Sequence, residues 1–222
     1  MRLRPLSLLE SRVLGVLVEK KHTVPDSYPL SLNALVLGCN QKSARDPVIN
    51  ASEAEVLAAA DDLKALSLVV ETSGSRVTRY EHNLQRVLGV PGQSVAILAL
   101  LMLRGPQTAA ELRASTERLH RFADISSVEG FLDEMADRPT VQGGPLVVKL
   151  PRAPGSREAR WMHLLGGPVD VQALAALAPS DDVVSAGEIA ALKASQAQLH
   201  SEVLRLRAQV QRLAAELGVE LS

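Results

Sequence analysis

The sequence has few aromatic residues, which make up 2% of its 222 positions. They are Tyr28, Tyr80, Phe122, Phe131 and Trp161. We therefore expect a core of Leu, Val, Ile and Ala. The sequence also offers no set of aromatic rings on which single-stranded bases could stack.

Cysteine, net charge and long apolar runs are also scarce. A single cysteine, Cys39, excludes a disulfide framework and a multi-cysteine zinc site. The 24 basic and 25 acidic residues give a net charge of −1, so the chain as a whole is not polybasic. The longest uncharged apolar run, from Val95 to Leu103, is too short to span a bilayer. We expect a cytoplasmic location, with Cys39 kept reduced and no membrane partner.

Motifs typical of enzymes are missing as well. No two histidines lie within five residues of each other, which excludes a His-x-x-x-His metal motif. There is no Gly-x-Ser-x-Gly motif and no glycine loop that could cradle a phosphate. Cys39 ends an apolar stretch, which favours a buried structural thiol over a nucleophile. We predict a protein that is not an enzyme and that needs no metal or cofactor.

Helix-start signals are abundant in this sequence. A Ser or Thr followed three residues later by Glu forms a capping box, in which the two side chains satisfy otherwise unpaired amide groups. Such pairs occur at Ser7–Glu10, Ser52–Glu55, Thr108–Glu111, Ser126–Glu129 and Ser185–Glu188. Each pair predicts the start of a helix.

Two segments show the same order of expected elements. The first has a helix ending near 20–21, a short helix over 29–35, a polar loop over 40–50, a third helix from Ser52, and strands at 68–72 and 76–82. The second has helices over 95–103, from Thr108 and from Ser126, with strands at 146–150 and 159–165. Pro106 lies 77 residues after Pro29 in a matching motif. Ser126 likewise lies 74 residues after Ser52, and these two near-equal offsets favour a duplication.

Three helices followed by a two-stranded hairpin are the order of a winged helix. We predict a mainly α fold with small β-hairpins (α+β). It would have a first winged-helix domain over 1–84, a linker over 85–92, a second domain over 93–167 and a linker over 168–184. Each domain is expected to have its own core.

A different period follows these segments. Apolar residues alternate in steps of three and four, which predicts a coiled-coil helix over 185–218. Leu at every d position and mostly β-branched a positions favour a parallel homodimer, with the polar Gln196 fixing the register. The alternative is a long helix that packs antiparallel on its own chain. The expected dimer contacts are Ile189, Leu192, Gln196, Leu199, Val203, Leu206, Val210, Leu213 and Leu217.

Several stretches carry a family resemblance. They read ESRVLGVLVEK at 10–20, YPLSLNAL at 28–35, CNQKSARDPV at 39–48, RGPQT at 104–108 and LPRAPGSREAR at 150–160. They resemble the bacterial YceH-like family over residues 6 to about 167. The resemblance implies tandem winged-helix domains, and it brings no established activity and no catalytic residues.

The polar loop of the first segment holds candidate DNA contacts. Its amide and cationic side chains are Asn40, Gln41, Lys42 and Arg45. Side chains of these types contact phosphates and base edges. The alternative is that Asn40 ends the preceding helix in a left-handed turn and that the rest is an ordinary solvated loop.

The expected hairpins carry further candidates. Arg76 and Arg79 flank the first hairpin loop, and Arg152, Arg157 and Arg160 lie in and beside the second. An arginine-bearing hairpin can rest on the phosphate backbone or in a minor groove. The alternative is a hairpin with ordinary solvated arginines.

The expected third helices oppose a simple DNA model. The third helix of a winged helix usually enters the major groove, where phosphates repel acids. These two helices are acidic, with Glu53, Glu55, Asp61 and Asp62 in the first and Glu129, Asp133, Glu134 and Asp137 in the second. Our hypothesis is a dimeric transcriptional regulator that binds double-stranded DNA. The alternative is a non-enzymatic scaffold that binds protein partners through these acidic helices.

Overall fold

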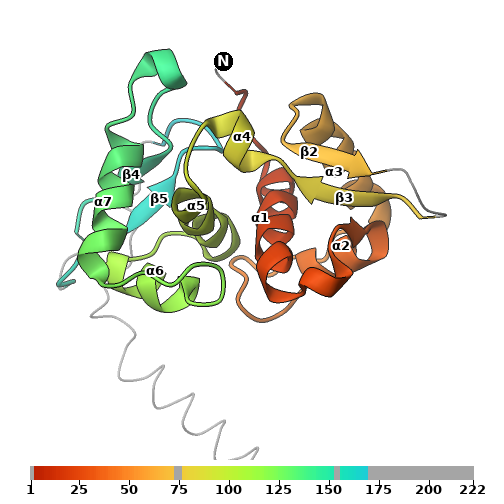
Figure 1. The fold of residues 1–222 in the computed structure, drawn as a ribbon, viewed down its shortest axis with the longest axis horizontal. Coiled ribbons are helices and arrows are strands. Elements are labelled where there is room, and N and C mark those ends of the chain that lie inside the picture. Colours follow the sequence, from red (N-terminus) through yellow and green to blue (C-terminus); the bar gives the residue numbers. More distant parts are fainter. Residues whose placement is uncertain (1–2, 73–76, 153–155, 170–222) are drawn as a thin grey trace, which may run out of the picture. The chain divides into compact units, whose positions relative to one another are not determined.

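The computed structural model describes residues 3–72, 77–152 and 156–169, which form a mixed α/β fold (Figure 1). Seven α-helices, two short 3-10 helices and two small antiparallel sheets make up this part of the chain. All of these residues except Ser156 belong to one compact unit.

The first half contains three helices and a three-stranded sheet (Figure 1). Its helices are α1 (Leu8–Thr23), α2 (Leu32–Cys39) and α3 (Glu53–Ala65), with a 3-10 turn, η1, at Pro25–Ser27. Its strands are β1 (Leu30–Ser31), β2 (Val69–Thr72) and β3 (Arg79–His82). They pair antiparallel in the order β1-β3-β2, with both Leu30 and Glu71 opposite Tyr80. The sequence predicts the hairpin but not β1.

The second half repeats this order after α4 (Leu84–Leu88). It contains α5 (Gly92–Arg104), α6 (Ala109–Thr116), α7 (Ile125–Ala136), the 3-10 turn η2 (Thr140–Gln142), β4 (Val147–Lys149) and β5 (Trp161–His163). Val148 lies opposite Met162 in the antiparallel pair. An isolated bridge joins Gln107 to Trp161. Gln107 stands 77 residues after Leu30, so the bridge takes the position that β1 holds in the first half.

The helix caps confirm three predictions and correct a fourth. Ser7, Ser52 and Thr108 each form a complete capping box with the Glu three residues later. The prediction for Ser126 is wrong, because α7 begins two residues earlier with Asp124 as its cap. The Asp124 Oδ1 accepts hydrogen bonds from both N and Oγ of Ser127, each at 2.7 Å. Asp is among the strongest N-cap residues, and Asp124 outcompetes Ser126.

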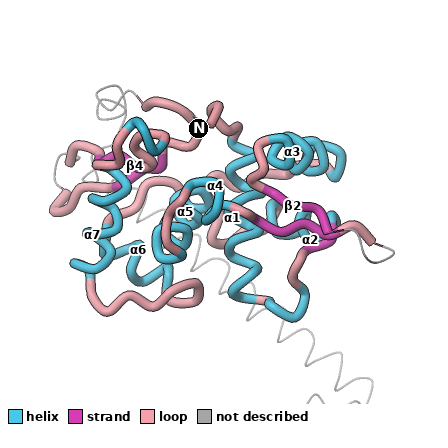
Figure 2. Tube along the Cα trace, turned by 45° about the horizontal axis from the view of Figure 1, so that its top comes forward, coloured by secondary structure: helices cyan, strands magenta, loops and turns pink. Residues whose placement is uncertain are grey.

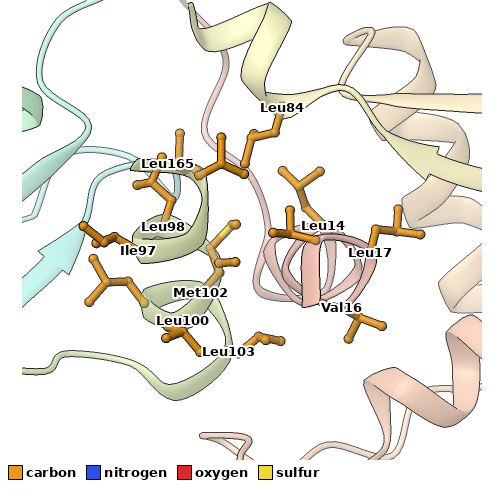
Figure 3. Close-up of a cluster of buried hydrophobic side chains, with 14 of the residues drawn as sticks. Leu14, Val16, Leu17, Leu84, Ile97, Leu98, Leu100, Met102, Leu103 and Leu165 are labelled. Carbon is orange, nitrogen blue, oxygen red and sulfur yellow. The ribbon is translucent and has the colours of Figure 1, made fainter. Parts of the chain in front are cut away.

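One continuous core serves both halves, in contrast to the two separate cores that we expected. Helices α1 and α5 pack against each other at its centre (Figures 2 and 3). Residues 10–19 of α1 and 94–103 of α5 are buried on every side. Gly15 allows the close approach, because a Cβ there would lie 2.9 Å from Leu103 Cγ.

The segment predicted as the first linker contains α4, whose residues Leu84 and Leu88 are buried in the same core. The heptad segment from Ile189 to Leu217, its capping pair Ser185–Glu188, and residues 170–184 of the second predicted linker lie outside the described residues. None of the helices in the described ranges has the length and apolar character needed to cross a membrane.

Candidate nucleic-acid interface

A helix that is buried on every side must satisfy its polar side chains inside the protein. In α1 the buried polar side chains include Glu10, Arg12 and Glu19. Glu10 accepts from Arg4 Nη1 at 2.9 Å, in addition to its role in the capping box. Arg12 and Glu19 both form hydrogen bonds with residues of the loop over 40–50. Two polar side chains of α1 therefore hold the candidate loop in place.

Arg45 lies inside that loop and not on its surface. Its side chain is 0% exposed. Its Nη1 and Nη2 donate to the two carboxylate oxygens of Glu19 at 3.1 and 2.6 Å, and its Nε donates to the Gly38 carbonyl at 3.2 Å. Burial alone would raise the pKa of Glu19, but the paired guanidinium of Arg45 lowers it below its ordinary value. The structure therefore removes Arg45 from the predicted phosphate contacts, because Glu19 already neutralises it.

Arg12 fixes the same loop at two further points. Its Nη1 donates to the Cys39 carbonyl at 3.0 Å, and its Nη2 donates to the Pro47 carbonyl at 2.6 Å. Burial lowers the pKa of Arg12, and the nearby charge of Arg45 lowers it further. The backbone of Asp46 also donates to the Leu103 carbonyl of α5 at 2.8 Å. The loop is thus held by α1, α2 and α5 together.

The remaining loop candidates differ in whether they already have hydrogen-bond partners within the protein. The Asn40 amide donates to the Ala51 carbonyl and accepts from the Ala51 N–H, both at 2.8 Å, which links the two ends of the loop. Asn40 has φ −89°, so the alternative that places it in a left-handed turn is wrong. Ala44 has the positive φ, at 57°. Gln41 accepts from Lys20 Nζ at 3.4 Å, whereas Lys42 is exposed.

The first hairpin is nearly balanced in charge. Arg79 is exposed at the start of β3, and its Nη1 donates to the Pro29 carbonyl at 2.8 Å. On the neighbouring strand, Glu71 forms an ion pair with Lys64, which also binds Asp61. Arg76 lies outside the described residues.

The second hairpin is basic. Arg152 and Arg157 are exposed on either side of its loop. Lys149, at the end of β4, places its Nζ 5.3 Å from the centre of the Trp161 ring, a cation–π contact across the strands. Arg160 is engaged, because it makes a two-pronged contact with Glu111 at 3.2 Å. Lys149 was not among the predicted contacts, although its position at the end of a predicted strand and close to Arg152 was a usable signal.

The acidic residues of α3 and α7 lie on the surface as expected. All eight are exposed: Glu53, Glu55, Asp61, Asp62, Glu129, Asp133, Glu134 and Asp137. Lys64 offsets part of this charge on α3 through Asp61. On α7 the described residues contain no such ion pair. Neither helix therefore presents a face that suits a phosphate-lined groove.

Cys39 is buried, as predicted, and burial raises the pKa of its thiol to about 12. A thiol with that pKa stays protonated at neutral pH and is a poor nucleophile. Across the described ranges, no three His, Cys, Asp or Glu side chains come together in a way that could hold a metal ion.

The two halves show the same order of helices with a hairpin at the end of each, and comparison with known proteins gives the family of the chain. The chain belongs to the family described as "Protein of unknown function, DUF480", whose model matches residues 6–156.

Close relatives are UPF0502 proteins. The relative from Methylibium petroleiphilum is 74% identical over 222 residues, covering 99% of this chain and 93% of the relative. The relative from Leptothrix cholodnii is 63% identical over 221 residues and 98% of each chain. The relative from Paraburkholderia phytofirmans is 63% identical over 218 residues, covering 98% of this chain and 92% of the relative.

Proposed function

We propose that each half is a winged-helix domain and that the protein is a cytoplasmic, YceH-like regulator that binds double-stranded DNA. The order helix, strand, helix, helix, hairpin in the first half, with sheet order β1-β3-β2, supports the winged-helix assignment. The second half repeats this order, with the Gln107–Trp161 bridge in place of β1.

The observation that carries the DNA proposal is the basic second hairpin. Lys149, Arg152 and Arg157 are exposed on one β-ribbon, with Glu158 as the neighbouring acid in the sequence. Exposed cations on a ribbon suit the phosphate backbone, which supplies most of the affinity of non-specific DNA binding. The wing would therefore make the main contact.

The acidic exposed faces of α3 and α7 shape the expected mode of binding. Insertion of either helix into the major groove would bring carboxylates close to phosphates, which costs free energy. We therefore expect contacts through the hairpins and Lys42, and little dependence on base sequence. With Arg45 removed, and with Lys149 counted as engaged on the Trp161 ring, the expected phosphate contacts are Lys42, Arg76, Arg79, Arg152 and Arg157.

The test is a fluorescence anisotropy titration of a labelled random-sequence duplex at several salt concentrations. Five phosphate contacts predict that log K falls against log salt with a slope of about −4.5, from about −0.9 per contact. The double variant Arg152→Ala/Arg157→Ala should reduce the steepness by about 1.8 and weaken binding to every sequence alike.

The matched control is Lys21→Ala/Arg86→Ala. Both residues are exposed, both lie outside the hairpins, and the change in net charge is the same. This control should leave the slope unchanged. Equal effects of the two double variants would show a response to net charge alone. No binding at low salt by folded protein would refute the DNA proposal.

A second candidate function rests on the acidic α7 surface. There Asp133, Glu134 and Asp137 are exposed without an ion pair in the described part of the chain, and such a surface would attract a basic protein segment. If the protein is a scaffold, the DNA titration is negative and a decalysine peptide binds. Asp133→Asn/Glu134→Gln should then weaken peptide binding, whereas the hairpin double variant should not.

We also propose that the segment over 185–218 forms a coiled-coil helix that pairs two copies of the chain, on the basis of its heptads. Light scattering of the full chain should give a dimer. Leu199→Asp/Leu206→Asp, which places charges at two d positions, should give monomers. Their near-ultraviolet circular dichroism should be unchanged, because all the aromatic residues lie between positions 28 and 161. A dimer that survives these changes would place the interface elsewhere.

A further inference from the structure

A cleft of about 740 Å³ lies within the compact unit. Its walls come from the segment over 3–5, α4, the loop between α7 and β4, and the segment that follows β5. The N-terminal segment is held in place there by a hydrogen bond from the Leu6 N–H to the Leu165 carbonyl at 2.8 Å. Pockets for small molecules commonly have volumes of about 300–1,000 Å³, so the cleft has the size of a ligand site.

The cleft has an apolar part and a polar part. Leu3, Val87, Leu88 and Leu146 supply much of the apolar wall. Arg138 and the exposed loop residues Thr140 and Gln142 supply polar groups. No Asp or Glu is among the described residues that line it, so the cleft is positively charged.

The two arginines in the cleft differ in their partners. Arg4 is already paired with the buried carboxylate of Glu10. Arg138, which lies two residues beyond the end of α7, is half-buried and donates from Nη2 to the Leu88 carbonyl. No carboxylate pairs with Arg138 anywhere in the described ranges. Burial lowers the pKa of Arg138, the sign of a charge that its surroundings do not compensate.

We propose that this cleft binds a small organic acid, with its apolar body against the leucine and valine wall and its acid group on the guanidinium of Arg138. A guanidinium has five N–H donors in a planar fork, and a carboxylate can accept two of them side by side. Among the described residues, Arg138 uses one donor group, the Nη2 that donates to the Leu88 carbonyl. An inorganic anion would satisfy the charge but leave the apolar wall in contact with water.

The direct test is a titration of the isotopically labelled full chain without DNA. The NMR chemical shifts of the Gly143 and Gly144 amides are monitored during the titration. Both glycines line the cleft, so a ligand there changes their signals. Four probes separate the contribution of the apolar wall to binding from that of the charge on Arg138. They are octanoate, octylammonium, 1-octanol and inorganic phosphate. Octanoate should give a saturable shift. Octanol, which lacks the charge, should bind at least about tenfold more weakly. Octylammonium and phosphate should give no saturable shift.

Two variants test the role of charge in the cleft. Arg138→Gln removes the cation and should weaken octanoate binding by about tenfold or more, the value of a hydrogen bond to a charged group. Thr140→Glu keeps Arg138 and adds a carboxylate at an exposed position on the rim, so it should weaken octanoate binding even if Arg138→Gln does not fold. Arg152→Gln, an equal loss of charge on the second hairpin, should leave octanoate binding unchanged.

The proposal is overturned by the absence of a saturable octanoate shift, by equal binding of octanoate and octylammonium, or by octanoate affinity that neither cleft variant lowers. Phosphate binding as tight as that of octanoate would also overturn it, in favour of a simple anion site. Since no duplex is present, these outcomes are independent of whether the protein binds DNA.

Discussion

Glu19→Gln should strongly destabilise the protein, because it leaves the guanidinium of Arg45 buried without its counter-ion. Arg45 is 0% exposed and Glu19 is 12% exposed at the side chain, and two hydrogen bonds of 3.1 and 2.6 Å join them. Removing one partner of such a buried pair costs about 3–5 kcal/mol. That is a large part of the roughly 5–15 kcal/mol by which domains are stable. The amide of the introduced glutamine would also place its own N–H donors against the N–H donors of Arg45.

Urea unfolding at neutral pH measures this cost. With an m-value of about 2 kcal/mol/M, the midpoint should fall by about 2 M. The matched control is Glu111→Gln, which weakens a two-pronged pair with Arg160 that is nearly half exposed, and it should cost at most about 1 kcal/mol. Glu19→Leu/Arg45→Met should cost less than Glu19→Gln alone, since no charge is then left buried. If Glu19→Gln costs no more than the control, the buried pair does not hold the loop.

Three other changes test local features of the fold. Gly38→Ala should cost about 1–3 kcal/mol in urea unfolding, because its Cβ would lie 2.5 Å from Val16 Cγ1; an unchanged midpoint would contradict the close packing of α2 on α1. Asp124→Ala should lower the Tm in calorimetry, whereas Ser126→Ala should not. If Ser126→Ala lowered the Tm and Asp124→Ala did not, Ser126 would be the N-cap of α7. Burial lowers the pKa of His163 to about 4, so its contribution to stability is complete above about pH 6.5 and is lost as the pH falls toward 4. The urea midpoint of His163→Gln should therefore fall less between pH 7 and 5 than that of the parent, and parallel pH profiles would refute this.

Local signals in the sequence predicted the elements well. Ser7, Ser52 and Thr108 each cap a helix because a capping box depends only on residues three apart, and such spacings are visible in a sequence. The Asp124 cap was missed because two competing cap residues stand close together. Strand β1 was missed because it is two residues long and depends on pairing with β3, some 50 residues later in the chain.

The candidate site was harder to predict, because a loop arginine has the same appearance in a sequence whether it faces solvent or a distant acid. The Glu19–Arg45 pair joins residues that lie 26 positions apart, and no spacing rule connects them. The signal lay in α1, where Arg12 and Glu19 flank the apolar run over 13–18, in the part of the helix that is buried on every side. Charged residues in such a helix need internal partners, which the loop supplies.

The packing of α1 on α5 also makes the two halves depend on each other for stability. In arrays such as ankyrin repeats, each copy contacts only its neighbours, so copies can be gained, lost or exchanged during evolution. Here α1 and α5, the first helices of the two halves, pack on each other, and a Cβ at Gly15 would lie 2.9 Å from Leu103 Cγ. A deletion that removed either copy would expose the central helix of the survivor to water. The two halves can therefore differ in sequence, but neither can be removed without exposing the central helix of the other.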